Sequence, residues 1–383
     1  MENRPFAGLD GVKVPEVFAE LPTPCYVLDA AQLQRNGEVL LGVQQRTGCK
    51  ILLAQKAFSN YDLYPLLSPY LAGTEASGLF EARLGREEMP EGEVHVFCGA
   101  YRAQDFAELL TYADHIVFNS PHQLKQFGLQ AKAAGRSIGL RINPECSTQD
   151  GHAIYDPCAP GSRLGTTRAQ WDAEMTPEWI GLLDGLHFHT LCEQDADALE
   201  VTVQAVEEKF GHVLGQMQWL NLGGGHHITR PGYDLTRLER CLLGLGMRYP
   251  QLQLYLEPGE ACALNAGYLV TEVLDVLQNA DVHLAILEDK PVSRFQLVSS
   301  LEERFIHGGI LESQIRTQRI RIDFLVPGRM LQEGFDFRSK DQIVIVQEGI
   351  VQRLDAEVIS GTIQPVLSGI RNHKGKHAAQ PFR

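Results

Sequence analysis

The stretch that decides the fold is Trp219 to Arg230, which reads WLNLGGGHHITR. An apolar run enters three consecutive glycines, and two histidines follow. Glycines let backbone N–H groups approach a ligand closely, because no Cβ obstructs them. This turn at the end of a strand predicts a site for an anionic group. The alternative is a tight glycine turn with a purely structural role.

Seven further short β-type runs accompany this one. They are KILLAQ (50–55), LAGTEAS (71–77), EVHVFCG (93–99), HIVFNS (115–120), IGLRINP (138–144), GLHFHTL (185–191) and LQLYLEPG (252–259). Helix-like stretches separate the runs. Many of the β-type runs are almost continuously apolar, as expected of parallel strands that are covered on both faces. Eight strand–helix units predict an α/β fold, a TIM-like (β/α)8 barrel.

The character of the sequence changes after Asn265. Segments such as GYLVTEVLDVLQN and QIVIVQEGIVQRL alternate apolar and polar residues, which is typical of half-exposed antiparallel strands. The sequence predicts a barrel over residues 35–265. It also predicts a β-rich, sandwich- or barrel-like domain formed by residues 1–34 and 266–383, with the N-terminal strand PTPCYVLD joining the C-terminal sheet.

Composition limits the class of function. The chain has 383 residues and a net charge of −14. No basic stripe that could neutralise phosphates is visible, so nucleic acid is not an expected partner. No apolar run approaches ~20 residues and no secretory signal is visible, so we expect a cytoplasmic protein that does not engage a membrane. The eight cysteines form no CxxC pair, which disfavours zinc-ribbon and thioredoxin-like readings.

Reactive residues in such barrels lie at the carboxyl ends of the strands. Lys56 ends the first strand, where burial is expected to lower the pKa of its amine and free it to attack a carbonyl. A rim lysine with its ammonium group in solvent is the alternative. Arg141 ends the fifth strand, and Glu257 ends the eighth. Glu257 would hold a proton on a heterocyclic nitrogen, or else pair with an arginine at the rim.

Phosphate sites in these barrels cluster in the loops after the seventh and eighth strands. The glycines that follow the seventh strand, Gly223, Gly224 and Gly225, predict such a site. The backbone N–H groups of Gly259 and Glu260, after the eighth strand, would complete it.

Histidines are the remaining candidates. His187 and His189 lie two residues apart, and with Glu193, His226 and His227 they raise the possibility of a metal site. No HExxH motif or helical spacing supports it, so we expect no metal. An imidazole lying flat on an aromatic cofactor is the preferred role for His189. Together with Lys56, the glycine turn and Glu257, it describes a site for pyridoxal phosphate, whose ring accepts charge from the substrate α-carbon.

The motifs QKAFS, ASGLFEARLG, GLRINPE, YDPCAPGSRLG, GLHFHTLCE, WLNLGGGHHITR and EPGEA occur in a specific order. Over roughly residues 20–287 the sequence resembles the fold-type III pyridoxal phosphate decarboxylases, and among them the carboxynorspermidine (carboxyspermidine) decarboxylases. The resemblance implies decarboxylation of a carboxylated triamine, in polyamine biosynthesis, by a homodimer with active sites shared between subunits.

The same resemblance assigns residue roles. It implies Lys56 as the Schiff-base lysine, His189 as the ring-stacking residue and Glu257 as the pyridine partner. Gly223 to Gly225, with Gly259 and Glu260, would hold the phosphate, and Glu260 would also face the substrate. Arg141 is expected at the cofactor site, with pairing to a nearby carboxylate as the structural alternative.

Beyond Leu287 the chain departs from the family pattern. The family's Cys, a proton donor to the α-carbon, has no counterpart, and Val351 falls where the family has Tyr. Asp341, Gly361 and Pro365 do coincide with it. Three explanations stay open: a paralogue that binds cofactor or polyamine without efficient catalysis, use of other groups such as His307, Asp323 or Asp336, and an altered C-terminal sequence. Action on another amino acid, as a decarboxylase or racemase, is a further alternative.

Overall fold

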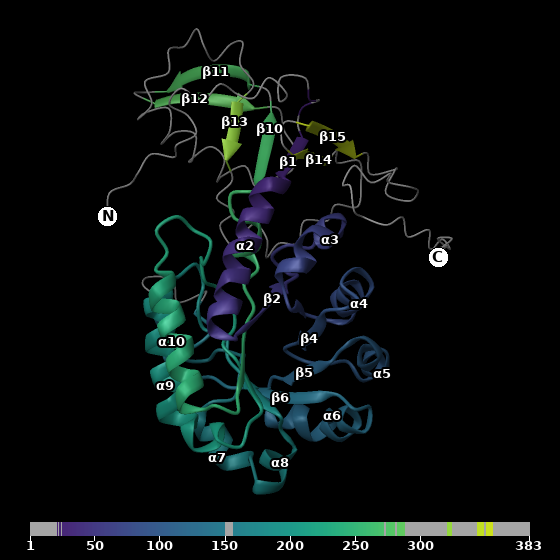
Figure 1. The fold of residues 1–383 in the computed structure, drawn as a ribbon, viewed down its shortest axis with the longest axis vertical. Helices are drawn as coiled ribbons and strands as arrows, with labels where there is room; N and C mark the ends of the chain where they lie inside the picture. Colours follow the sequence, from purple (N-terminus) through teal and green to yellow (C-terminus); the bar gives the residue numbers. More distant parts are fainter. Residues whose placement is uncertain are drawn as a thin grey trace. The chain divides into compact units, whose positions relative to one another are not determined.

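The fold was analysed in a computed structural model, which describes residues 21, 23, 25–149, 156–271, 273–279, 282–287, 320–323, 343–347 and 350–354. These residues fall into two units, one of which contains Ala30–Ala266. Figure 1 shows this unit in purple to green. No helix in the described part of the chain has the length and hydrophobicity needed to cross a membrane.

Eight parallel strands close into a barrel in sequence order. They are β2 (Lys50–Ala54), β3 (Gly73–Ala76), β4 (Glu93–Phe97), β5 (His115–Phe118), β6 (Ser137–Arg141), β7 (Gly185–His187), β8 (Trp219–Asn221) and β9 (Gln253–Leu256). Each predicted run overlaps one of these strands, so the prediction of a TIM-like α/β barrel is confirmed. The barrel closes where Lys50 and Ile51 of β2 pair with Tyr255 and Leu256 of β9.

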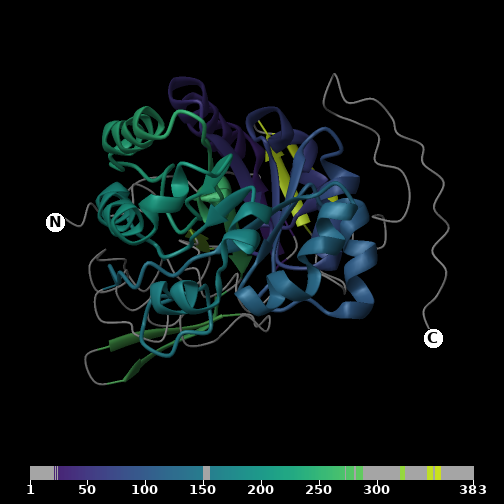
Figure 2. The same cartoon turned by 90° about the horizontal axis from the view of Figure 1, so that it is seen from below.

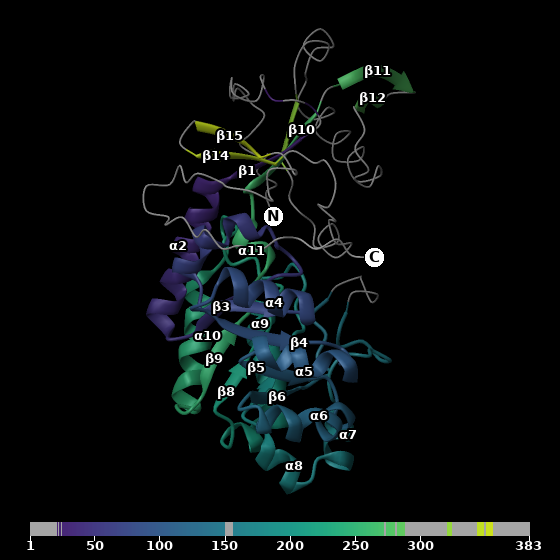
Figure 3. The ribbon, with the colours of Figure 1, turned by 90° about the vertical axis from the view of Figure 1, so that its right-hand side faces the viewer.

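Helices surround the strands, as Figures 2 and 3 show. The longer ones are α2 (Ala30–Thr47), α4 (Leu79–Glu88), α5 (Ala103–Tyr112), α6 (Pro121–Ala133), α9 (Ala196–Leu214) and α10 (Leu235–Arg248). The short ones are α3 (Tyr64–Leu67), α7 (Arg168–Glu174), α8 (Pro177–Leu182) and α11 (Glu260–Ala263). Local sequence fixes several starts: the side chains of Ser120 and Asp234 accept hydrogen bonds from Gln123 N and Arg237 N and so cap α6 and α10.

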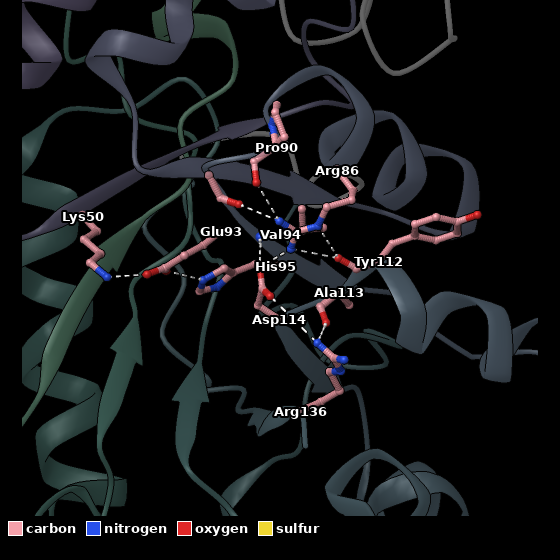
Figure 4. Close-up of polar contacts among 11 residues, drawn as sticks. Lys50, Arg86, Pro90, Glu93, Val94, His95, Tyr112, Ala113, Asp114 and Arg136 are labelled. Atoms are coloured by element: carbon pink, nitrogen blue, oxygen red, sulfur yellow. Dashed lines mark hydrogen bonds and ion pairs between the residues drawn. The ribbon is translucent and has the colours of Figure 1, made fainter. Parts of the chain in front are cut away.

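The amino-terminal end of the barrel is closed by a packed layer of rings. His95 and His115 stack with their centroids 3.9 Å apart, and the rings of Trp219 and Tyr255 pack around them. The His95 ring also lies beside Glu93, which pairs with Lys50 (Figure 4). Burial and the neighbouring His95 lower the pKa of His115 to about 2. The His115 imidazole is therefore neutral at physiological pH, and we call this layer of rings the barrel floor.

The network in Figure 4 extends from the barrel floor to the outside of β4 and β5. Arg86 of α4 donates to Asp114 Oδ2 at 2.5 Å, and that oxygen also accepts from Val94 N at 2.8 Å. Arg136 donates to the carbonyl of Ala113 at 3.0 Å. These hydrogen bonds connect the ends of helices to the starts of strands, so the polar groups of this network have a structural role.

The second unit contains the remaining strands. β1 (Cys25–Asp29), β10 (Gly267–Thr271), β13 (Ile320–Asp323), β14 (Ile343–Gln347) and β15 (Ile350–Leu354) form one sheet, and β11 (Val273–Asn279) pairs with β12 (Val282–Leu287). The N-terminal strand β1 lies between β10 and β14.

Several C-terminal residues named in the sequence analysis lie outside the description. His307, Asp336, Asp341, Gly361 and Pro365 are not among the described residues, and the side chains of Asp323 and Val351 are not described. The extent of a β-rich second domain therefore stays a prediction.

Candidate functional site

The candidate site is built at the carboxyl ends of the barrel strands, around the buried carboxylate of Glu257. This residue directly follows β9 and is 2% exposed. Its Oε1 lies 3.0 Å from His187 Nε2 and 3.0 Å from His189 Nδ1, and its Oε2 accepts from Asn221 Nδ2 at 3.1 Å. Three groups therefore fix one carboxylate in a dry environment.

The charge of Glu257 is set by these neighbours. Burial acts to raise its pKa, but His187, His189 and Lys56 outweigh burial and hold the pKa well below its ordinary value. The pKa of His189 falls to about 4, mainly because of burial and the cation of Lys56. Glu257 is consequently ionised at neutral pH, and His189 is neutral.

The His189 Nδ1 atom has two partners of opposite kinds. It lies 3.0 Å from Glu257 Oε1, and Gly224 N points at it from 3.3 Å. When Nδ1 carries a proton it donates to the carboxylate, and when it does not it accepts from the glycine amide. His189 thus links the glycine turn to Glu257.

Lys56 lies two residues beyond the end of β2, and its side chain is 41% exposed. Its Nζ is 3.5 Å from Oε2 of Glu75, a buried residue of β3. Burial would lower the pKa of the lysine, but the carboxylates of Glu75 and Glu257 raise it above its ordinary value. The prediction of a lowered pKa is therefore wrong for this arrangement, because it did not take Glu75 into account.

Glu75 is a site residue that the sequence analysis missed. Burial and the nearby Glu257 raise its pKa to about 8, against the opposing effect of Lys56. A carboxylic acid with such a pKa can exchange a proton near neutral pH. The signal in the sequence is a lone carboxylate inside the otherwise uncharged run LAGTEAS, next to a strand that ends in lysine.

Arg141 is the last residue of β6 and is buried. It donates from NH2 to the carbonyl of His189 at 2.9 Å, and its guanidinium lies over the Phe97 ring at 4.4 Å. Burial lowers its pKa to about 10, so it remains a cation. Arg141 holds the backbone of the loop after β7, and its charge lies near Glu257 and Glu75.

The glycine turn after β8 is forced by neighbouring backbone. A Cβ on Gly224 would lie 2.2 Å from the Glu257 carbonyl oxygen, and one on Gly225 would lie 2.0 Å from the Leu191 carbonyl oxygen. Gly223 has a φ of 77°, in the left-handed region. The glycines therefore do have the structural role of a tight turn, and the same constraint leaves the turn without side chains.

Gly259 packs equally tightly on the other side of the site. A Cβ there would lie 2.2 Å from the Ala57 Cβ, next to Lys56. Among the described residues, the amides of Gly225, Gly259 and Glu260 donate to no acceptor. Bare backbone with free donors fits an anionic group such as a phosphate.

The histidine candidates divide into two groups. His187, His189 and Glu257 have potential ligand atoms that all lie within 4.8 Å of one another. His226 and His227 lie apart from this group: His226 Nδ1 is 3.4 Å from the Tyr233 hydroxyl, and His227 Nε2 is 3.2 Å from Glu260 Oε2. In the first group, His187 and His189 both contact the carboxylate of Glu257, so these buried histidines hold Glu257 in place.

Known proteins resemble this chain over most of its sequence. No protein-family model matches the chain. A carboxynorspermidine/carboxyspermidine decarboxylase of Campylobacter jejuni is 40% identical over 271 residues, which is 71% of this chain and 68% of the relative. A carboxyaminopropylagmatine decarboxylase of Synechocystis is 38% identical over the same shares of both chains.

Solved structures give a similar picture. The crystal structure of the C. jejuni carboxynorspermidine decarboxylase complexed with norspermidine has a TM-score of 0.63 and 32% identity, and covers 86% of this chain and 83% of that one. Diaminopimelate decarboxylase from Helicobacter pylori, at 17% identity and a TM-score of 0.64, shares the fold. On this identity and coverage, the chain belongs to the carboxynorspermidine/carboxyspermidine decarboxylase family.

Proposed function

We propose that this chain is a pyridoxal phosphate-dependent carboxy-lyase that converts carboxynorspermidine or carboxyspermidine to norspermidine or spermidine in polyamine biosynthesis. The observation that carries the proposal is the convergence of Lys56, His189 and Glu257 beside the glycine turn, in a chain of this family.

The residues present fit pyridoxal phosphate. Lys56 offers a partly exposed amine for covalent attachment, and Glu257 offers an ionised carboxylate that can hold a proton at the ring nitrogen. The glycine turn and the free amides of Gly259 and Glu260 would bind the phosphate. His189 would lie against the ring. When bound, the cofactor supplies a ring that accepts the electron pair left at the α-carbon as CO2 departs.

A proton would be transferred between Lys56 and Glu75. The lysine must lose a proton before its Nζ attacks a carbonyl, and its raised pKa opposes that loss. Glu75, with a pKa of about 8 and its Oε2 3.5 Å away, is placed to accept this proton in its ionised form. The pair then restores the ammonium form when the lysine is released.

Substrate recognition would use a carboxylate. Glu260, 16% exposed at the start of α11, carries a negative charge that suits an ammonium group of a triamine. The net charge of −14 adds a long-range attraction for a cationic substrate.

A second candidate substrate is carboxyaminopropylagmatine. The Synechocystis relative named for that activity is 38% identical, almost as similar as the C. jejuni relative. A guanidinium group in place of an ammonium group would also pair with the carboxylate of Glu260. The two substrates are distinguished by the ratio of their kcat/KM values.

The proton donor to the product departs from the family pattern. The family's Cys and Tyr have no counterpart here, so we propose a reaction slowed by roughly 10²–10⁴-fold, the usual contribution of a positioned general acid. We also infer a homodimer with shared active sites. All eight cysteines lie among the described residues and none forms a disulfide, which favours a reducing, cytoplasmic location.

The test is CO2 release from carboxynorspermidine by purified protein supplied with pyridoxal phosphate, with the visible absorbance of the lysine-bound cofactor followed in parallel. Lys56→Ala should lose both signals. Lys125→Ala, which alters a surface pair with Glu174, should keep both. Cofactor absorbance without CO2 release from either substrate would instead identify a binding protein that lacks catalysis.

A further inference from the structure

Three loops at the carboxyl end of the barrel are joined around Glu260. Gln194, in the loop after β7, donates from N to the Gly225 carbonyl at 3.0 Å, and its own carbonyl accepts from His227 N at 3.2 Å. Thr229 Oγ1, in the loop after β8, donates to the Ala261 carbonyl in α11 at 2.6 Å. These hydrogen bonds therefore fix the loop that carries His227 against the helix that carries Glu260.

A row of side chains crosses these loops. Arg230 NH2 donates to both carboxylate oxygens of Asp195. Arg230 NH1 donates to His227 Nδ1 at 3.2 Å. On the other side of the imidazole, His227 Nε2 lies 3.2 Å from Glu260 Oε2. The row thus runs from the partly exposed Asp195 to the carboxylate proposed to meet the substrate.

The row determines where the imidazole proton lies. A guanidinium can only donate hydrogen bonds, so His227 Nδ1 must be the acceptor. A neutral imidazole with an accepting Nδ1 carries its proton on Nε2. That proton faces Glu260, and among the described residues His227 Nε2 has no aligned hydrogen-bond partner, although Glu260 Oε2 is in contact. Contacts of this kind often become aligned only when the substrate is bound.

We propose that Arg230 and His227 are positioning residues that orient the Glu260 carboxylate toward an ammonium group of the substrate. One carboxylate oxygen would be engaged by the His227 Nε2–H, which leaves the other for the cation. The contact also turns the negative side chain of Glu260 toward His227 while its backbone amide remains available to the phosphate. This inference rests on the proposed function, because it assumes that Glu260 contacts a polyamine.

The proposal is tested by the affinity of the cofactor-loaded protein for norspermidine, measured by calorimetry. Glu260→Gln, Arg230→Met and His227→Leu should each raise the Kd about tenfold or more, since each removes a charge-assisted contact or its support. His227→Gln should stay within about threefold of the wild type, because its amide can donate from a position close to that of Nε2. In turnover, KM should rise while kcat changes little.

Arg237→Met is the matched control. Its side chain is 37% exposed, as is that of Arg230, and from α10 it pairs with Glu200 of α9 at 2.7 Å. The Kd of this variant should equal that of the wild type. Cofactor absorbance should be unchanged in every variant, which separates loss of orientation from loss of folding.

The outcomes separate the inference from the proposed function. If Glu260→Gln weakens binding but Arg230→Met and His227→Leu do not, the positioning role is refuted and the substrate contact stands. If His227→Gln is as weak as His227→Leu, the role of the imidazole is one of packing, and the proposal fails. If Glu260→Gln binds norspermidine normally, Glu260 is not a substrate contact and both statements about it are overturned, whereas CO2 release still tests the decarboxylase assignment.

Discussion

Replacing Gly224 with alanine tests the glycine turn directly. The added Cβ would lie 2.2 Å from the Glu257 carbonyl oxygen and 3.0 Å from its carbonyl carbon. Non-bonded carbon contacts are favourable at about 3.5–4.0 Å, so the methyl group must move away from Glu257 by roughly 1 Å. The change is confined to one methyl group at the centre of the candidate site.

The surrounding hydrogen bonds prevent the turn from moving freely. Glu257 N donates to the Gly223 carbonyl at 2.9 Å, and Leu222 N donates to the Tyr255 carbonyl at 2.9 Å. A displacement of 1 Å therefore separates the turn from Glu257 and His189. Misplacement by about 1 Å can cost roughly 10²-fold in rate, so kcat/KM should fall by about that factor. Overpacking should cost about 1–3 kcal/mol of stability.

The assay follows cofactor affinity by absorbance titration, polyamine formation by chromatography, and the melting temperature. Gly181→Ala in α8 is the control, because a Cβ there meets nothing within 4 Å. Its melting temperature should be unchanged or raised, since alanine favours a helix more than glycine does by up to about 1 kcal/mol. Wild-type cofactor affinity and wild-type turnover in Gly224→Ala would refute the assignment of this turn to the cofactor site.

Other predictions concern the groups around Glu257 and the barrel floor. Glu257→Gln should lower kcat by about 10²–10⁴-fold with the protein still folded, as judged by its melting temperature, because an amide does not hold a proton as a carboxylate does. Asn221→Ala should destabilise the protein by about 1–3 kcal/mol in melting experiments, because Glu257 Oε2 and Gly223 N both lose a partner; a loss of activity with no change in stability would contradict this. Acid should destabilise the protein, because folding lowers the pKa of His115 from 6.5 to about 2. The contribution of the neutral His115 to the free energy of unfolding is complete above pH 6.5. It is lost as the pH falls toward the folded pKa, at about 1.4 kcal/mol per pH unit. The melting temperature should fall from pH 6.5 to 5, and His115→Phe should show a shallower fall.

Much of the fold could be predicted because of the physics of a closed parallel sheet. Both faces of each strand are covered, so runs such as KILLA and HIVF are apolar at every position after the first and stand out in the sequence. The order of the strands in the barrel then follows from the chain order. The positions of Lys56, Arg141 and Glu257 follow from the same reasoning, because each lies at or just beyond the end of such a run.

The contacts between strand ends were harder to predict. Glu75 and Asn221 are buried polar residues within strands, and only the closed barrel shows that one faces Lys56 and the other Glu257. The raised pKa of Lys56 follows from that missed carboxylate. His226 and His227 form one motif in the sequence but contact different partners, Tyr233 and Glu260, because the turn after the glycines separates their side chains.

The barrel floor has a consequence for the entry and release of small molecules. Trp219 and Tyr255 are at most 3% exposed, and the His95–His115 pair fills the space beside them. Gas liberated at the other end of the strands would meet these buried, packed rings in this direction. Carbon dioxide and the amine product would leave by the route through which the substrate arrived, so the order of departure, rather than a separate channel, would determine how soon the next molecule enters.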